Sequence, residues 1–310
     1  MLAIIVVSYN TRTLLQACLA SVYCGLQTSG LAGEAWVVDN VSSDGSADMV
    51  RGEFPSAHLI AHPENVGFAA ANNLALRAIG FGAPDAARVL PEAVLLLNPD
   101  TLILDDALGG LCRALHEQPG TGVVGAALVY PDSRCQHSAF RFPDLLQVFF
   151  DFFPLNHRLT DSRLNGRYAR SLYAAGRPFA IDFPLGAALM ARREAIQQVG
   201  LMDERFFMYC EEIDWCLRFR QAGWDISCVP QARIVHYAAQ STRQFRDQMF
   251  VALWRSRFRL FEKHYSPFFR WAVHRIVTLG ARHGIAQASR RLSGEELERF
   301  VAAHQAITEL

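Results

Sequence analysis

The stretch Val94-Leu95-Leu96-Leu97-Asn98-Pro99-Asp100 is an uninterrupted apolar run that ends in an amide, a proline and a carboxylate. Such a run is typical of a strand that is buried on both faces, as in the middle of a parallel sheet. Because proline cannot donate a hydrogen bond to a sheet, the strand should stop near Asn98 and present Asp100 at its carboxyl end. In open α/β sheets, ligands bind at that edge.

Asp100 itself has two interpretations. A carboxylate followed by the apolar Leu102-Ile103-Leu104 can hold a divalent cation through its hard oxygen atoms. The alternative is an aspartate that caps the next helix or turns the chain. This segment alone leaves both interpretations open.

The chain before this stretch repeats a strand-then-helix pattern. Buried strands are expected over 2–8, 35–39 and 58–61, and each is followed by a helical segment, the last of which runs to about Ile79. Strands that alternate with helices form right-handed βαβ units. The sequence therefore predicts an α/β protein with a mainly parallel sheet flanked by helices.

The chain after this stretch is less regular. A helix over 105–116 and a strand over 123–129 are expected, whereas residues 131–183 carry scattered prolines and glycines and show no clear period. Regular structure should return with a strand over 187–191, helices over 193–199 and 211–222, and a last strand over 224–229. An apolar stripe at helical spacing, Phe250 to Phe261, indicates a helix beyond that.

Composition excludes some classes of function. The chain has 310 residues, is 51% hydrophobic and 19% charged, and carries a formal net charge of zero. This balance is ordinary for a globular protein and provides no field that would favour nucleic acid as the partner. The region from Arg243 to Arg282 is locally basic, because its only acidic residues are Asp247 and Glu262.

The cysteines and the apolar segments indicate a cytoplasmic protein. The seven cysteines are an odd number without a C-x-x-C pair, which is typical of reduced thiols. The first strand is too short for a signal peptide and lacks a basic flank. The sequence contains no run of about 18 apolar residues, so no membrane-spanning helix is expected.

Acidic residues stand at or near several predicted strand ends. They are Asp39, Asp100 and the group Glu211-Glu212-Ile213-Asp214. In a doubly wound sheet such strand ends converge on one cleft, so three acidic positions there suggest a catalytic or binding site. Asp39 can accept a hydrogen bond from a base or a ribose, although taken alone it is more often a helix cap.

A series of short motifs occurs in order along most of the first 245 residues. The motifs are Val6-Val7-Ser8-Tyr9-Asn10, Val37-Val38-Asp39-Asn40, Ser43-Asp44-Gly45-Ser46, Asn65-Val66-Gly67-Phe68, Leu97-Asn98-Pro99-Asp100, Gly186-Ala187-Ala188, Val199-Gly200-Leu201-Met202-Asp203-Glu204, Glu211-Glu212-Ile213-Asp214-Trp215-Cys216-Leu217-Arg218 and His236. Each is weak alone, but together and in this order they resemble the family 2 glycosyltransferases, and within them the rhamnosyltransferase-like branch.

The resemblance implies a fold and a reaction. It implies a GT-A (Rossmann-like) catalytic domain over 1–242, in which 131–183 form an acceptor-side loop region, followed by a basic, aromatic helical segment over 243–310. It further implies an inverting transfer that uses a dTDP- or UDP-sugar donor and a divalent metal, Mg²⁺ or Mn²⁺. L-Rhamnose from dTDP-rhamnose is the expected sugar, and a glycan or lipid-linked saccharide is the expected acceptor.

The resemblance also implies roles for individual residues. Asp39 would bind the nucleobase, and Asp100 and His236 would hold the metal. The further donor-binding positions would be Ser8, Asn10, Asn65, Gly67, Asn98 and Gly186. The family keeps an acid where this chain has Asn98, so the metal would have less charge around it here.

The expected catalytic base is Glu212, with Asp214 as its competitor. An acceptor hydroxyl must lose its proton as it attacks the anomeric carbon, and a nearby carboxylate can take that proton. Crowding Glu211, Glu212 and Asp214 together should raise at least one pKa toward neutrality. Arg218 stands one helical turn after Asp214, which predicts an ion pair between them.

The basic C-terminal segment has two interpretations. Its aromatic residues are Trp254, Phe258, Phe261, Tyr265, Phe268, Phe269 and Trp271. With the arginines between them they fit interfacial helices over 243–283 that would contact the inner face of the cell membrane peripherally. Alternatively the stripe packs on the catalytic domain or on a second subunit.

Two other functions remain to be considered. A sugar nucleotidyltransferase would share the parallel sheet, but it needs a glycine-rich phosphate loop after the first strand, where this chain has Tyr9-Asn10-Thr11-Arg12. A non-catalytic nucleotide-sugar-binding or scaffold protein would bind the donor without turnover. The sequence indicates no oligomeric state.

Overall fold

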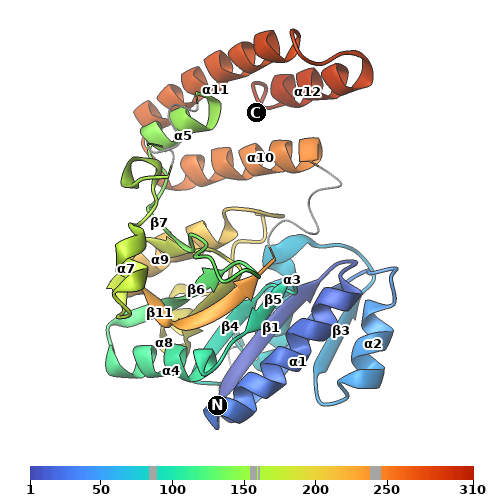
Figure 1. Cartoon of the computed structure of the whole chain (residues 1–310), viewed down its shortest axis with the longest axis vertical. Coiled ribbons are helices and arrows are strands. Elements are labelled where there is room, and N and C mark those ends of the chain that lie inside the picture. Colours follow the sequence, from blue (N-terminus) through green and yellow to red (C-terminus); the bar gives the residue numbers. More distant parts are fainter. Residues whose placement is uncertain (84–88, 154–158, 160, 238–245) are drawn as a thin grey trace. The chain divides into compact units, whose positions relative to one another are not determined.

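The computed structural model describes residues 1–83, 89–153, 159, 161–237 and 246–310, which form two compact units. Unit 1 comprises 1–140, 168–207 and 211–241 (Figure 1). Unit 2 comprises 141–167, 208–210 and 242–310. The expected domain boundary between residues 242 and 243 lies outside the described residues.

Unit 1 is built on one large mixed sheet, which has nine strands among the described residues. These strands are β1 (Leu2–Ser8), β2 (Gly33–Asn40), β3 (His58–His62), β4 (Ala93–Leu97), β5 (Thr101–Ile103), β6 (Thr121–Val129), β8 (Phe179–Ala180), β10 (Ala188–Arg192) and β11 (Asp225–His236). Their order is β3-β2-β1-β4-β10-β6-β11-β5, with β8 paired to β11. A separate two-stranded sheet joins β7 (Ala139–Phe140) and β9 (Phe183–Pro184).

The first four strands run parallel, as their sequence pattern predicted. β6 and β11 are also parallel to each other, whereas β10 lies antiparallel between β4 and β6. β4 ends at Leu97, immediately before the Asn-Pro pair, as expected. The carboxyl ends of β1, β2, β3 and β4 therefore share one edge of the sheet.

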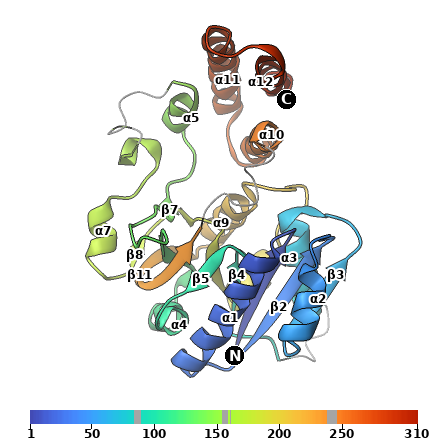
Figure 2. The same ribbon diagram turned by 45° about the vertical axis from the view of Figure 1, so that its right-hand side comes forward.

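Helices cover both faces of this sheet (Figure 2). They are α1 (Arg12–Ser29), α2 (Ser46–Glu53), α3 (Gly67–Ile79), α4 (Ala107–Glu117), α7 (Arg170–Ala174), α8 (Arg193–Val199) and α9 (Glu211–Gln221). α1, α2 and α4 lie on one face, where α1 contacts both of the others, and α8 contacts α9 on the other. The arrangement is a mixed, mainly parallel sheet between two helical layers, as predicted.

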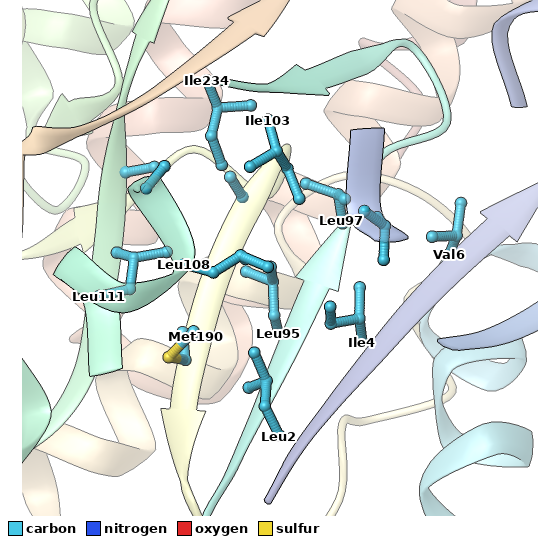
Figure 3. Close-up of a cluster of buried hydrophobic side chains, with 14 of the residues drawn as sticks. Leu2, Ile4, Val6, Leu95, Leu97, Ile103, Leu108, Leu111, Met190 and Ile234 are labelled. Atoms are coloured by element: carbon cyan, nitrogen blue, oxygen red, sulfur yellow. The ribbon is translucent and has the colours of Figure 1, made fainter. Parts of the chain in front are cut away.

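The main core lies between the sheet and the layer of α1 and α4 (Figure 3). Alternate residues of a strand face the same side, so Leu2, Ile4 and Val6 of β1 point into this core together. Leu95 and Leu97 of β4 join them, and α1 and α4 supply further buried leucines. This alternation explains why both strands are apolar throughout: one set of residues faces each helical layer.

Two strands differ from expectation. β5 was not predicted, because a three-residue strand is too short to show a period; it pairs antiparallel with β11. β11 runs to His236 rather than ending near residue 229, and it passes Pro230 through a register shift between Val229 and Arg233. Such an irregularity lets a strand accommodate a proline that cannot donate to the ladder. His236 is therefore the last residue of a strand, not a residue beyond it.

Residues 131–183 are not the continuous loop that was expected. They contain the helices α5 (Leu145–Phe152) and α7 as well as a short 3-10 turn, η1 (Arg163–Asn165). The side chain of Asp144 caps α5 by accepting a hydrogen bond from the backbone N–H of Gln147 (2.9 Å). α5 has a polar side, where Gln147 and Asp151 lie one turn apart, but its eight residues are too few to stand out among the scattered prolines and glycines, which explains the wrong prediction.

Unit 2 contains α5 and three C-terminal helices, α10 (Arg246–His264), α11 (Pro267–Ala288) and α12 (Gly294–Ala306). Trp254 and Phe261 of α10 are almost completely buried, and the Trp254 ring lies 5.0 Å from that of Phe152 in α5. These two aromatic residues belong to the core of unit 2, together with buried aliphatic residues such as Leu260 and Val273. None of the helices in the described ranges has the length and apolar character needed to cross a membrane.

The packing of α11 on α5 depends on Gly280. A Cβ atom at this position would overlap the side chain of Phe152. We predict that Gly280→Ala lowers the free energy of unfolding by about 1–3 kcal/mol, the usual cost of overpacking. Gly284→Ala is the matched control on the same helix, because its Cβ would lie 3.4 Å from the His304 ring, in ordinary contact. Urea unfolding checks both, and equal stabilities would contradict this packing.

Candidate active site

The site lies at the edge where β1, β2, β3 and β4 end. Ser8 pairs in register with Asp39 at this edge. The Ser8 hydroxyl is buried and shares a hydrogen bond with the Thr11 hydroxyl (2.9 Å), so it holds the turn after β1. Asn10 joins this turn to the loop after β2: its N–H donates to Ser42 Oγ (2.9 Å), and its Oδ1 accepts from the N–H of Ser43 (2.8 Å).

Asp39 has one carboxylate oxygen in use and one without a partner. Oδ2 accepts a hydrogen bond from the backbone N–H of Ser42 (3.0 Å), whereas the buried Oδ1 has no hydrogen-bond partner. The residue is only 3% exposed. An unpaired acceptor in a buried position costs free energy, so it favours a ligand that brings a donor, such as the N–H of a nucleobase.

Asn40 holds the next loop in place. Its Oδ1 accepts from the N–H of Val66 (3.3 Å), and its Nδ2 donates to the carbonyl of Gly67 (3.3 Å). The exposed Asn65 caps the same turn by accepting from the N–H of Gly67 (3.0 Å). Gly67 has a positive φ of 81°, and a Cβ there would collide with the carbonyl oxygen of Phe207. Only glycine satisfies both constraints.

The residues just before β10 lie between the loop that follows β4 and the candidate base, Glu212. The N–H of Asn98, just past the end of β4, donates to the carbonyl of Ala187 (2.9 Å). Gly186 therefore sits next to the β4 edge, and the side chain of Glu212 lies against it, 3.6 Å from where a Cβ of Gly186 would be. The structure thus brings Asn98, Gly186 and Glu212 together.

Glu211 and Glu212 open α9 and have perturbed acidities. Burial raises the pKa of Glu212 to about 7. Burial, and then the neighbouring Glu212 carboxylate, raise the pKa of Glu211 well above its usual range. The expected rise is present, but its main cause is desolvation rather than crowding by three acids. The Oε2 atoms of both residues are buried without a hydrogen-bond partner.

Asp214 lies in the expected ion pair with Arg218. Its carboxylate is completely buried, and Oδ2 lies 2.9 Å from Arg218 Nε. The two other guanidinium nitrogens donate to the carbonyls of Val199 (3.0 Å) and Leu201 (2.9 Å). Asp214 and Arg218 therefore fasten α9 to the segment after α8, and this use of the Asp214 carboxylate differs from that of Glu212.

Asp100 and His236 meet because β5 pairs with β11. Thr101 is in register with His236, and the N–H of Tyr237 donates to the Asp100 carbonyl (3.0 Å). Asp100 Oδ1 lies 3.4 Å from His236 Nε2, and both side chains are largely buried. The other ring nitrogen, Nδ1, lies 3.1 Å from Gln136 Oε1. An amide oxygen can only accept, so this contact puts a proton on Nδ1, and Nε2 is the ring nitrogen that faces Asp100.

The pair Asp100–His236 suits a divalent cation. Two neighbouring ligands of an octahedral ion stand about 3 Å apart, which agrees with the 3.4 Å between Oδ1 and Nε2. Within the described ranges no group of three or more His, Cys, Asp or Glu side chains gathers as a metal site. A cation here would therefore take its remaining ligands from water and a diphosphate, as Mg²⁺ commonly does.

Gln136 and Asn40 were not singled out as site residues from the sequence. Gln136 lies in the irregular segment after β6, where its N–H donates to the Leu128 carbonyl (2.9 Å). No local pattern marks it, because its partner His236 is 100 residues away. Asn40 was visible within the Asp39-Asn40 motif, but its role in holding a distant loop was not.

Known proteins with similar sequences agree with the function that this geometry suggests. A family model described as "Glycosyltransferase like family 2" matches residues 1–259. The chain is 27% identical over 278 residues to the N-acetylglucosaminyl-diphospho-decaprenol L-rhamnosyltransferase of Mycobacterium tuberculosis, covering 86% of this chain and 88% of that protein. It is 28% identical over 171 residues to the rhamnosyltransferase WbbL of Escherichia coli, covering 54% of this chain and 61% of that protein.

Solved structures support the fold. The mannosyltransferase PcManGT from Pyrobaculum calidifontis, in complex with GDP-Man and Mn²⁺, has a TM-score of 0.57 at 16% identity and covers 99% of this chain and 84% of its own. TarS of S. aureus has a TM-score of 0.52 at 14% identity and covers 97% of this chain and 47% of its own. These likenesses confirm the predicted GT-A fold.

The buried carboxyl of Glu211 should make stability depend on pH. Its pKa is higher in the folded than in the unfolded chain, so it favours folding at low pH, and this contribution is lost as the pH rises. We predict that Glu211→Gln becomes progressively more stable than the wild type from pH 5 to pH 9, by up to about 1.4 kcal/mol per pH unit. Thermal unfolding across this range checks it. The exposed Glu298→Gln is the control, and a parallel pH dependence of the wild type and Glu211→Gln would contradict the assignment.

Proposed function

Because this chain belongs to the glycosyltransferase-like family 2, and is a glycosyltransferase, we propose that it transfers L-rhamnose from dTDP-rhamnose to a lipid-linked saccharide with inversion at the anomeric carbon. The observation that carries the proposal is Glu212: a half-buried carboxyl group with a pKa raised to about 7, lying against Gly186 at the sheet edge. Both relatives are rhamnosyltransferases, which supports the sugar, and the decaprenol-linked acceptor of the Mycobacterium tuberculosis relative supports the lipid-linked acceptor.

Glu212 acts as the general base in this proposal. It takes the proton from the acceptor hydroxyl while that oxygen attacks the anomeric carbon, and the nucleoside diphosphate leaves from the opposite face. A base with a pKa near the working pH is both available and strong enough for this transfer. Asp214 is the less suitable candidate, because it is completely buried and its carboxylate is paired with Arg218.

The donor is held at the edge of the parallel strands. The free Oδ1 of Asp39 accepts the imide N–H of thymine or uracil. Asn10 and Asn65 shape the loops on either side of Asp39, and Gly67 and Gly186 leave space for the chain and the sugar to approach closely. Asn98 adds a neutral amide where a carboxylate would add charge.

Asp100 and His236 are the residues that would hold Mg²⁺ or Mn²⁺. The cation would neutralise negative charge that develops on the leaving diphosphate. Gln136 positions His236 for this purpose, because its amide oxygen accepts from Nδ1–H and so turns Nε2 toward Asp100, where the cation would bind. The mannosyltransferase PcManGT, a structural relative, was solved in complex with Mn²⁺, which supports the choice of a divalent ion.

The function is tested by incubating the protein with dTDP-rhamnose and an N-acetylglucosaminyl-diphospho-lipid, and following dTDP release together with a product extended by one deoxyhexose. Nuclear magnetic resonance of the new linkage reports whether the anomeric configuration has inverted. Donor binding without turnover across a panel of acceptors would favour a scaffold protein instead. A nucleotidyltransferase would release pyrophosphate rather than dTDP.

Glu212 provides the first prediction that follows from the proposed function. Glu212→Gln keeps the size of the side chain but cannot take a proton, so kcat should fall by about two to four orders of magnitude with little change in donor affinity. In the wild type kcat/KM should rise with pH through about 7, because the base must be deprotonated. Asp214→Asn is the comparison: if the folded Asp214→Asn protein is inactive and Glu212→Gln is active, the base is Asp214.

Asp39 provides the second prediction. Uracil and thymine present an N–H at the position where cytosine presents a bare nitrogen, so dTDP and UDP should raise the melting temperature more than CDP does. Asp39→Asn should reduce this preference, because an amide can turn a donor toward cytosine. Differential scanning fluorimetry checks the ranking. A shift with GDP alone would overturn the assignment of Asp39 to a pyrimidine base.

The metal ligands provide the third prediction. In the presence of dTDP, Asp100→Asn should weaken Mn²⁺ binding at least about tenfold, whereas Asn98→Asp should retain or tighten it by adding a charge. Gln136→Leu should weaken it by about tenfold and also change the tautomer of His236 in the metal-free protein. Calorimetry and ¹⁵N chemical shifts of the imidazole give the two readouts. Full activity in excess chelator would refute the metal role.

A further inference from the structure

Helix α11 exposes an apolar and basic stripe along one side. Phe268, Trp271, Arg275, Leu279 and Arg282 follow one another at intervals of three or four residues, which places them on the same side of the helix. The three apolar members are 70%, 56% and 59% exposed, in that order. We call these five residues the α11 stripe. Its large exposed apolar side chains set it apart from an ordinary solvated helix face.

The opposite side of α11 accounts for its packing. Val273, Val277, Gly280, Ala281 and Ala288 are buried there. The aromatic residues of α10 that the sequence grouped with this region, Trp254 and Phe261, are buried as well. The packing interpretation therefore explains α10 and the inner side of α11, but it does not explain the α11 stripe.

The charge along α11 has one sign. The helix contains Arg270, Arg275 and Arg282 and no acidic residue. The guanidinium of Arg275 stands 5.7 Å from the centre of the Trp271 ring, and the Phe268 and Trp271 rings stack 5.9 Å apart. Paired aromatic rings flanked by arginines suit the boundary between lipid headgroups and acyl chains, where the rings enter the apolar layer and the guanidinium groups stay with phosphates.

We propose that the α11 stripe binds the surface of an anionic phospholipid bilayer, with Phe268 and Trp271 inserted at the level of the headgroups. This inference rests on the proposed function in one respect, since an acceptor carried on a lipid keeps its reactive sugar close to a bilayer. The negative surface potential of such a bilayer attracts Arg275 and Arg282.

A second copy of the chain is a poorer occupant. If two α11 stripes packed against each other around a two-fold axis, their arginines would face the same surface on the partner. α11 offers no carboxylate to compensate them. Phosphate groups of a lipid surface supply that negative charge, and acyl chains take up the exposed rings.

The test is co-sedimentation of the full chain with vesicles that contain no acceptor. One set contains phosphatidylcholine alone, and the other contains equal parts of phosphatidylcholine and phosphatidylglycerol. We expect binding to the anionic set, weakened by salt, and at least about a tenfold loss of the partition coefficient for both Phe268→Ser/Trp271→Ser and Arg275→Glu/Arg282→Glu. The control is Arg163→Glu/Leu164→Ser, which changes an exposed basic and apolar pair in η1 and should bind like the wild type.

Fluorescence reports which residue enters the bilayer. Trp271 is 56% exposed, whereas Trp215 and Trp254 are buried. Adding anionic vesicles should therefore shift the emission to shorter wavelength, and Trp271→Phe should bind but lose that shift. Circular dichroism and transfer to a soluble acceptor analogue confirm that each variant is folded.

The outcomes separate this inference from the proposed function. Vesicle binding that depends on the α11 stripe supports the inference even if no rhamnose is transferred. Equal binding by the stripe variants and the wild type overturns it even if transfer is confirmed. A wild-type dimer in solution that becomes a monomer in Phe268→Ser/Trp271→Ser, without vesicle binding, also overturns it and assigns the stripe to a second copy.

Discussion

The antiparallel pairing of β10 with β4 is the constraint on which the active site depends. It brings Gly186 back to the edge where β4 ends, through the hydrogen bond from Asn98 to Ala187. The side chain of Glu212 lies against Gly186 at that edge. The parallel strands β1 to β4 alone would gather only the loops proposed to bind the donor. The antiparallel strand β10 adds the position against which the carboxyl group of the proposed reaction lies.

The strands and helices of the first hundred residues were predictable because each is long and has a single dominant pattern. β1 and β4 are apolar throughout, and the proline after Asn98 ends β4. The failures have equally local causes. β5 has only three residues, and α5 has only eight among scattered prolines and glycines, so neither is long enough to stand out in the sequence. β11 continues past Pro230 only because its register shifts, and no sequence pattern indicates such a shift.

Candidate site residues were predictable where one short motif contains both the residue and the neighbours that shape its environment. Asp39, Asp100 and the Glu211-Glu212 pair follow that rule. What the sequence did not contain were contacts between distant segments: Gln136 with His236, and Asn40 with the loop at Gly67. The distinction between Glu212 and Asp214 also needed the structure. Helical spacing predicted an ion pair for Arg218, but only the structure shows that the paired Asp214 carboxylate is completely buried, whereas Glu212 lies against Gly186. Two residues apart on one helix, Glu212 and Asp214 occupy different environments.

Gly67 has a consequence for how members of this family can exchange segments. Its backbone lies against Phe207, and the N–H of the next residue, Phe68, donates to the Phe207 carbonyl (2.7 Å). The donor-side loops and the segment that leads into α9 therefore meet with no space between them. A chimera that joins the first half of one enzyme to the second half of another must match these two loops as a pair. The loop at Gly67 and the segment at Phe207 therefore constrain each other across the two halves of this chain.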